Sequence, residues 1–140
     1  MLMNESFDAV GESFTPYHKI PRPMTMIHQS RQGIGRKAFN RFARDIRRPV
    51  LDLAEILPSS YSTLTKKEVF DKATSQQIIL LQKLFAYGTE VFGDIDIFNE
   101  WLDIELGSLE GVTPFSILDT SFGIELIEME LYKIDHGLPV

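Results

Sequence analysis

Residues 113–123 read TPFSILDTSFG, and they decide how the C-terminal part of the chain folds. Thr113-Pro114 is a helix-start signal, because proline is tolerated in the first turn of a helix. Asp119-Thr120 is a second start signal, since a short polar side chain accepts hydrogen bonds from the free N–H groups of a new helix. We therefore predict a short helical turn, a break at Asp119-Thr120 and a final helix that begins there.

The apolar residues of this final helix fall on two faces. One stripe, at steps of three and four residues, comprises Ile124, Ile127, Leu131 and Ile134. A second set, on nearly the opposite side, comprises Phe122, Leu126 and Met129. Such a helix is either sandwiched within its own fold or keeps one face for another protein, and both alternatives stay open here. Gly123 would let another backbone approach closely, and Gly137 ends the helix before a short tail.

The rest of the chain also shows helical spacing and no strand-like alternation, so we predict an all-α fold. Helices are expected over residues 36–46, 50–57 and 61–70, and two helices on a basic background joined by a tight turn form a helix-turn-helix candidate. A capping box at Thr74–Gln77 predicts a long buried helix over 75–92, followed by one capped by Asp94. Residues 1–34 show no sustained period and are expected to form an irregular arm.

Composition and charge narrow the class of protein. The 140 residues contain no cysteine, which excludes disulfides and thiolate metal sites. The N-terminal residues include acidic side chains, whereas a signal peptide begins with basic ones. No apolar run approaches the length of a membrane-spanning helix, so we expect a cytoplasmic protein with no membrane partner. Residues 19–83 hold 13 basic and 5 acidic side chains, whereas residues 84–140 hold one basic and 12 acidic. This asymmetry predicts a basic surface for polyanions and an acidic surface for a different partner.

Catalytic and metal-binding patterns are lacking in the sequence. The three histidines, His18, His28 and His136, lie far apart and have no metal-ligand spacing. The glycines of QGIGRKAF lack the features of a phosphate loop. His136 beside Asp135 could act as a base, but in the last turn of a helix it more often caps carbonyl groups. We therefore predict a protein that is not an enzyme and binds no cofactor or metal.

The basic half is a candidate DNA-binding surface. The early residues of the helix at 61–70 would face the major groove, and the arginines of the first helix would lie along the phosphate backbone. The predicted DNA-binding residues are Arg36, Arg41, Arg44, Arg47, Arg48, Tyr61, Ser62, Thr63, Thr65, Lys66 and Lys67. The alternatives are that these helices are only solvated or that they lie on a membrane.

Segments of the C-terminal half resemble the toxin-binding domain of Xre/ParS/MbcA-type antitoxins. The resemblance rests on VFGD at 91–94, WL at 101–102 and SLEGVTPFSILDTSFGIELIEMELYKIDHG at 108–137. The family pattern is matched by Leu109, Gly111, Pro114, Leu118, Asp119, Thr120, Gly123, His136 and Gly137. Glu110 and Ile117 stand where the family has glycine and leucine. Upstream, residues 35–67 resemble the family's Xre-like helix-turn-helix more loosely, because Thr65-Lys66-Lys67 replaces an arginine run.

The resemblance implies an antitoxin of a type II toxin–antitoxin system. Its partner would be a RES-domain toxin that degrades NAD⁺, and the antitoxin's C-terminal end would obstruct the toxin's active site. The N-terminal domain would form a homodimer within a larger complex and bind the operon's own promoter. The toxin-binding residues that we expect are Trp101, Leu109, Gly111, Pro114, Asp119, Thr120, Gly123, Leu126, Glu130, Lys133, His136, Gly137, Leu138, Pro139 and Val140.

We accordingly expect three parts. Residues 1–34 form the arm, residues 35–73 the helix-turn-helix region for DNA binding and dimerisation, and residues 74–140 the toxin-binding domain. The alternative is a stand-alone helix-turn-helix regulator or adaptor without a toxin, in which the acidic part serves for oligomerisation.

Overall fold

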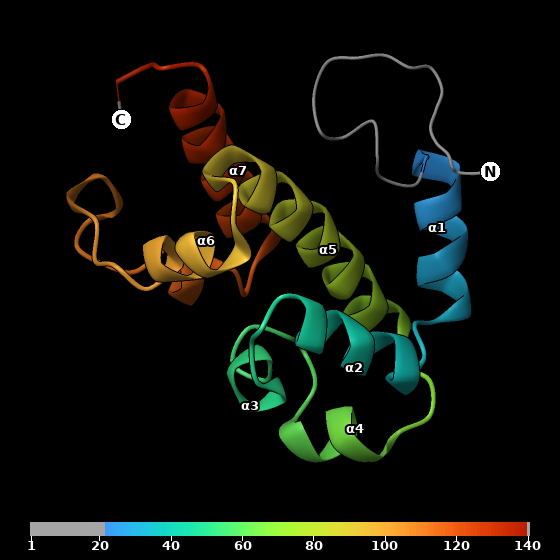
Figure 1. The fold of residues 1–140 in the computed structure, drawn as a ribbon. Coiled ribbons are helices and arrows are strands. Elements are labelled where there is room, and N and C mark those ends of the chain that lie inside the picture. The colour runs from blue at the N-terminus through green and yellow to red at the C-terminus, as the bar shows by residue number, and fades with distance from the viewer. Residues whose placement is uncertain (1–21, 140) are drawn as a thin grey trace.

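The computed structural model describes residues 22–139, and over this range the expected all-α fold is confirmed (Figure 1). Within these residues there are helices and no strand, apart from an isolated antiparallel bridge between Gly35 and Val69. The α-helices are α1 (Pro23–Gln32), α2 (Arg36–Asp45), α3 (Val50–Leu53), α4 (Tyr61–Lys66), α5 (Lys72–Phe92), α6 (Ile95–Leu102) and α7 (Ser121–Asp135). Two short 3₁₀ turns, η2 (Gly107–Leu109) and η3 (Phe115–Ile117), lie between α6 and α7.

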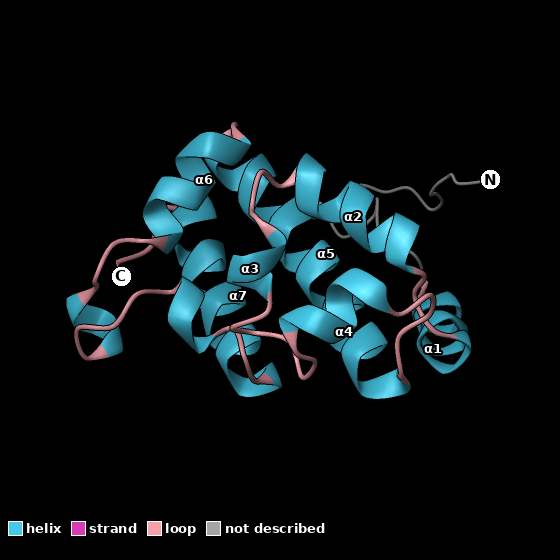
Figure 2. Cartoon of the chain, turned by 90° about the horizontal axis from the view of Figure 1, so that it is seen from below, coloured by secondary structure: helices cyan, strands magenta, loops and turns pink. Residues whose placement is uncertain are grey.

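Helix α5 is the central element of the molecule. Helices α1, α6 and α7 all pack against it, and Figure 1 shows α1 on one side of α5 and the α6–α7 part on the other. Helices α2, α3 and α4 contact one another and lie on one side of α5 (Figures 1 and 2), with the Phe42 ring of α2 against Phe85 of α5. The expectation that the long helix is buried is confirmed, because Ile78, Leu81, Leu84 and Phe85 are at most 1% exposed.

The N-terminal boundary differs from the expectation. The arm expected over residues 1–34 contains helix α1, which begins with Pro23 and docks on α5. The Ile34 N–H donates to Ser75 Oγ at 2.8 Å, which ties the segment after α1 to the long helix. The helix was missed because its few apolar residues show no period and its position depends on packing against α5. The rest of the expected arm, residues 1–21, lies outside the described residues.

Three helix ends also differ from the predicted ones. The helix expected over residues 50–57 is the shorter α3, which ends at Leu53 and is followed by turns. Helix α5 begins at Lys72, and its N-cap is Asp71, whose carboxylate accepts a hydrogen bond from the Thr74 N–H at 2.9 Å. This hydrogen bond holds the pKa of Asp71 below its ordinary value. Helix α4 ends at Lys66 instead of continuing to Phe70. The residues beyond it leave the helix because Val69 pairs with Gly35 and the Phe70 N–H donates to the Ile34 carbonyl.

Aromatic rings join α5 to α6. The Phe98 ring lies against Gly88, where an added Cβ would come within 2.3 Å of the ring. Phe98 also contacts Phe85 edge-on at 5.2 Å between ring centroids and stacks with Phe92 at 5.8 Å. Gly88 therefore serves close packing of the two helices, a role that the sequence alone did not reveal.

Candidate functional site

The entry into α7 has the predicted geometry. The Gly123 N–H donates to Thr120 Oγ1 at 3.0 Å, so Thr120 is the N-cap of the helix. Gly123 is buried, and an added Cβ there would lie 1.6 Å from the Ile117 carbonyl oxygen. The close backbone neighbour of Gly123 is thus η3 of the same chain. On the other side, the Gln77 side chain donates to the Leu118 carbonyl at 2.8 Å and attaches the turn to α5.

The two apolar sets on α7 have different environments. Ile124, Ile127 and Leu131 are at most 2% exposed and form the face that packs against α5. The other face is open, with Phe122 80%, Leu126 40% and Met129 57% exposed. We call these three residues the outer face of α7. Tyr132, 50% exposed, lies one turn beyond Met129.

The C-terminal end of α7 forms a hydrogen-bonded stop. The Leu138 N–H donates to the Lys133 carbonyl at 2.8 Å, and the Gly137 N–H donates to the Ile134 carbonyl at 3.2 Å. With Gly137 in the left-handed region at φ 67°, these bonds make the Schellman arrangement that ends many helices. The chain beyond the helix therefore leaves in a direction set by backbone geometry.

His136 belongs to this stop. Its Nδ1 lies 2.9 Å from the Tyr132 carbonyl oxygen, and its ring stacks on the Tyr132 ring at 4.0 Å between centroids. This geometry matches the capping role weighed for His136 in the sequence. Leu138 and Pro139 are exposed beyond it, and Val140 lies outside the described residues.

Tyr87 connects the end of α7 to α5. Its hydroxyl lies 3.5 Å from Asp135 Oδ2, and its side chain is 2% exposed. Burial, with a further contribution from the Asp135 carboxylate, raises the pKa of Tyr87 to about 12. The last turn of α7 is therefore held on the long helix, while its outer face remains open.

The expected toxin-binding residues divide into structural and exposed ones. Leu109, Pro114, Gly123 and Glu130 are buried, and they hold the η2–η3 segment and α7 in place. Lys133 is half-buried, and its ammonium lies 3.4 Å from the Glu130 carboxylate. Trp101 is half-buried and packs on Phe92 and Phe98. The exposed ones are Gly111, Asp119, Thr120, Leu126, His136, Gly137, Leu138 and Pro139.

The site prediction left out three residues that share the open side of α7 with Leu126. The expected toxin-binding set omits Phe122 and Met129, although their spacing places them on the same face as Leu126, and it also omits Tyr132. Phe122 and Met129 lie four and three residues from Leu126, and Tyr132 lies three residues beyond Met129, so helical spacing is the signal that identifies them.

A second exposed surface lies on α2 and α4. Lys37, Arg41 and Arg44 are exposed at steps of four and three residues, so they form one basic stripe along α2. We call these residues the α2 stripe; Lys37 was absent from the predicted set although it has the same spacing. On α4, the exposed predicted residues are Tyr61, Ser62, Thr65 and Lys66, with Lys67 at the C-cap. The two helices contact each other, so the two groups lie on neighbouring elements.

Three of the other predicted DNA-binding residues have partners within the chain. Thr63 is half-buried in the first turn of α4, where its N–H donates to Ser60 Oγ at 3.1 Å. Arg36 donates to the Lys66 carbonyl at 2.7 Å, which joins the start of α2 to the end of α4. Arg47 pairs with Asp96 of α6 at 2.6 Å, although both side chains are more than half exposed.

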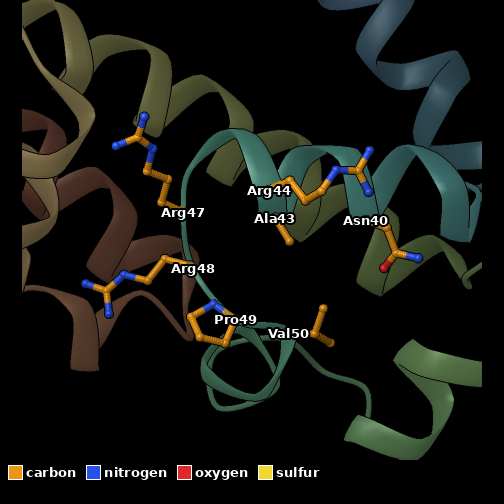
Figure 3. A pocket seen from close by; sticks show the side chains of 7 residues that line it. All are labelled: Asn40, Ala43, Arg44, Arg47, Arg48, Pro49 and Val50. Carbon is orange, nitrogen blue, oxygen red and sulfur yellow. The ribbon is translucent and has the colours of Figure 1, made fainter.

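Arg48 is a correction to the predicted DNA-binding set. Its side chain is 8% exposed, and its guanidinium donates to Asn99 Oδ1 at 2.8 Å and to Asp103 Oδ1 at 2.9 Å. The same group lies 4.1 Å from the centre of the Phe115 ring. These contacts leave Arg48 no access to an outside phosphate, and Figure 3 shows its side chain directed away from Arg44 and Asn40. Arg48 therefore joins the basic part of the chain to the acidic part, which the charge split of the sequence did not indicate.

Residues 22–139 include no group of three histidine, cysteine or acidic side chains arranged to hold a metal ion. Over the same range, no helix has the length and apolar character needed to cross a bilayer.

Comparison with known proteins identifies the C-terminal part. Residues 88–137 match the family model of the antitoxin Xre/MbcA/ParS C-terminal toxin-binding domain, which confirms the resemblance over that segment. The matched range begins at the last turn of α5 and includes α6, both 3₁₀ turns and α7. No curated protein matches the chain at a significant level. The match supports an antitoxin role with a toxin partner, and a regulatory, non-enzymatic protein.

Proposed function

We propose that this chain, which carries an antitoxin toxin-binding domain over residues 88–137, neutralises a RES-domain toxin that degrades NAD⁺. The observation that carries the proposal is the outer face of α7, three large apolar side chains left open in that domain. Exposed apolar patches of this kind mark protein-binding surfaces. The toxin covers Phe122, Leu126 and Met129, and the tail beyond Gly137 obstructs the toxin's active site.

The residues that fix the start and the end of α7 support this mode of binding indirectly. Thr120 and Gly123 set the angle at which α7 leaves η3, and the Schellman stop sets the direction of the tail. A binding element held in this way loses little conformational entropy when the toxin binds. We therefore assign positioning roles to Leu109, Pro114, Gly123 and Glu130, and contact roles to Leu126, His136, Leu138 and Pro139. Acidic neighbours such as Glu125 and Asp135 suit a toxin whose NAD-phosphate pocket is basic.

Loss of NAD⁺ in the presence of purified toxin tests the occlusion mechanism. A chain that stops at Gly137 is expected to bind the toxin and to inhibit NAD⁺ loss less completely, because it lacks Leu138 to Val140. The matched control replaces Leu138, Pro139 and Val140 by serine at full length, which keeps the backbone but removes the apolar groups. Undiminished inhibition by the truncated chain would exclude obstruction by the tail.

We further propose that the basic part represses the operon by binding its promoter. The observation that favours this second activity is the α2 stripe beside the exposed residues of α4. Residues 35–73 would then be the helix-turn-helix region, with Tyr61, Ser62 and Thr65 toward the bases and Arg41, Arg44 and Lys66 on phosphates. The working assembly is a homodimer within a larger complex with the toxin.

Electrophoretic mobility shifts with the chain's own promoter region test the second activity. Specific binding that is lost in an Arg41→Gln, Arg44→Gln double variant is the expected result. Its control is a Lys72→Gln, Lys83→Gln double variant, which removes the same charge from α5. If the chain binds the toxin but no DNA, the antitoxin assignment stands and the repressor assignment fails. If it binds DNA but no toxin, the stand-alone regulator is correct.

A further inference from the structure

A hollow of about 470 Å³ lies where α2 ends and α3 begins (Figure 3). Its lining contains no carboxylate and consists of Asn40, Ala43, Arg44, Arg47, Arg48, Pro49 and Val50. The asparagine and the arginines provide hydrogen-bond donors, and Ala43, Pro49 and Val50 provide apolar surface. A positive group beside apolar surface is less fully hydrated, so it attracts an anion more strongly than a free side chain does.

Asn40 and Arg44 lie on the accessible side of the hollow. They are one helical turn apart on α2, and Figure 3 shows the Arg44 guanidinium extended along the helix toward Asn40. Arg44 is exposed, and within residues 22–139 it has no ion-pair partner. It is also the last member of the α2 stripe, so the hollow continues a basic surface that can follow a phosphate backbone.

Arg47 and Arg48 differ in how firmly they are held. Arg47 adopts the left-handed conformation at φ 58°, which turns the chain out of α2 toward α3. Its pair with Asp96 is exposed, with side chains 64% and 52% accessible, and exposed pairs of this kind contribute little stability. Arg48 is buried and has several partners, so it stays in place. Arg47 is therefore the arginine that can exchange its partner.

We propose that this hollow binds one phosphate group of a DNA backbone through Asn40 and Arg44, and that Arg47 leaves Asp96 to join it. The proposal rests on the DNA-binding part of the proposed function and adds a specific subsite to it. A phosphate offers several acceptor oxygens, which suits a guanidinium fork and a neighbouring amide better than one carboxylate does. The exchange frees Asp96 at the start of α6, so occupancy of the hollow breaks the ion pair between Arg47 and the domain at residues 88–137.

The first test measures binding of the full chain to a labelled mixed-sequence DNA duplex by fluorescence anisotropy over a range of salt concentrations. Asn40→Asp places a carboxylate beside Arg44, and it is expected to reduce the slope of log affinity against log salt by about 0.9, the loss of one phosphate contact. Ser108→Asp adds the same charge on exposed η2 and is expected to leave the slope unchanged. Arg44→Gln provides a second variant, with the same expected loss. An unchanged slope in both Asn40→Asp and Arg44→Gln overturns the subsite.

The second test addresses the exchange of Arg47. Asp96→Asn should raise the affinity for the duplex about threefold more than Glu100→Gln, which removes one charge from the same helix without releasing an arginine. Equal effects of the two variants overturn the exchange. A wild-type chain that does not bind the duplex refutes the DNA-binding function itself. If the duplex binds the Asn40→Asp and Arg44→Gln variants as it binds the wild type, only the subsite is refuted.

The third test distinguishes the source of the phosphate. NMR signals of the Asn40 side-chain amide and the Arg44 Nε–H are followed while inorganic phosphate or the duplex is added. Shifts with the duplex alone identify a DNA subsite, and shifts with both identify a site for phosphate groups that DNA also occupies. Shifts with neither overturn the proposal.

Discussion

Gly123 is a position where a single methyl group should disturb the packing of α7. In Gly123→Ala the new Cβ would lie 1.6 Å from the Ile117 carbonyl oxygen, whereas ordinary contacts begin at 3.4 Å. Helix α7 and η3 must therefore separate by roughly 1.8 Å, the difference between those distances. The obstacle is backbone, so no side-chain rotation can relieve it.

The expected cost can be worked out from two opposing effects. Overpacking of a close contact costs about 1–3 kcal/mol and is at the upper end when backbone must move. Alanine gains about 1 kcal/mol over glycine inside a helix. The net loss is about 2 kcal/mol, which corresponds to a fall in Tm of about 8 °C for a domain of this size.

Thermal unfolding followed by circular dichroism measures this change. The matched control is Gly107→Ala, because a Cβ at Gly107 has no atom within 4 Å. The control should unfold within about 2 °C of the wild type. A Gly123→Ala variant as stable as the wild type would show that Gly123 does not determine the packing of α7, and the reasoning would be refuted.

The remaining predictions concern the cap, the buried arginine and the tyrosine. Thr120→Ala removes the N-cap of α7, so it should lower the free energy of unfolding by about 1 kcal/mol and speed amide exchange at Gly123. Thr120→Ser should keep the wild-type stability and exchange rate. Slow exchange in the alanine variant would contradict the capping role. Arg48→Met should lower the free energy of urea unfolding by about 2 kcal/mol, less than the roughly 3–5 kcal/mol of a fully buried broken pair, because Asp103 is 58% exposed. A more stable variant would refute the assigned role. The raised pKa of Tyr87 means that the folded state keeps the phenol proton to about pH 12, so its contribution to stability is complete below pH 10 and is lost between pH 10 and 12. Tyr87→Phe should lose less stability than the wild type between pH 10 and 12. If the free energy of unfolding falls equally with pH in the two proteins, a buried, neutral Tyr87 is contradicted.

The helical class and much of α2, α5 and α7 could be predicted because their apolar residues recur at helical spacing. The start of α7 was predictable for a local reason, since Thr120 caps the helix through atoms three residues away. Helix α1 could not be predicted, because its position depends on contacts with α5 far along the chain. The end of α4 was misplaced for the same reason, as the Gly35–Val69 bridge joins distant residues.

The site was predictable only in part. Spacing placed Phe122, Leu126 and Met129 on one face, but whether that face is open depends on which side of α7 meets α5. The burial of Arg48 was hidden because Asn99 and Asp103 lie some fifty positions away in sequence. Charge counts alone assigned Arg48 and its acidic partners to separate surfaces, whereas the folded chain joins them.

Calorimetric titration of the toxin with a Leu126→Arg variant tests the central claim most directly. Leu126 is 40% exposed on the outer face of α7, so the change should leave the fold intact while it places a charge in the apolar contact. Leu51→Arg makes the same substitution on α3, where the leucine is 62% exposed and lies outside the matched domain. We predict that Leu126→Arg weakens toxin binding about 100-fold and that Leu51→Arg binds as the wild type does. Wild-type affinity in Leu126→Arg would contradict the assignment of the outer face of α7 to the toxin.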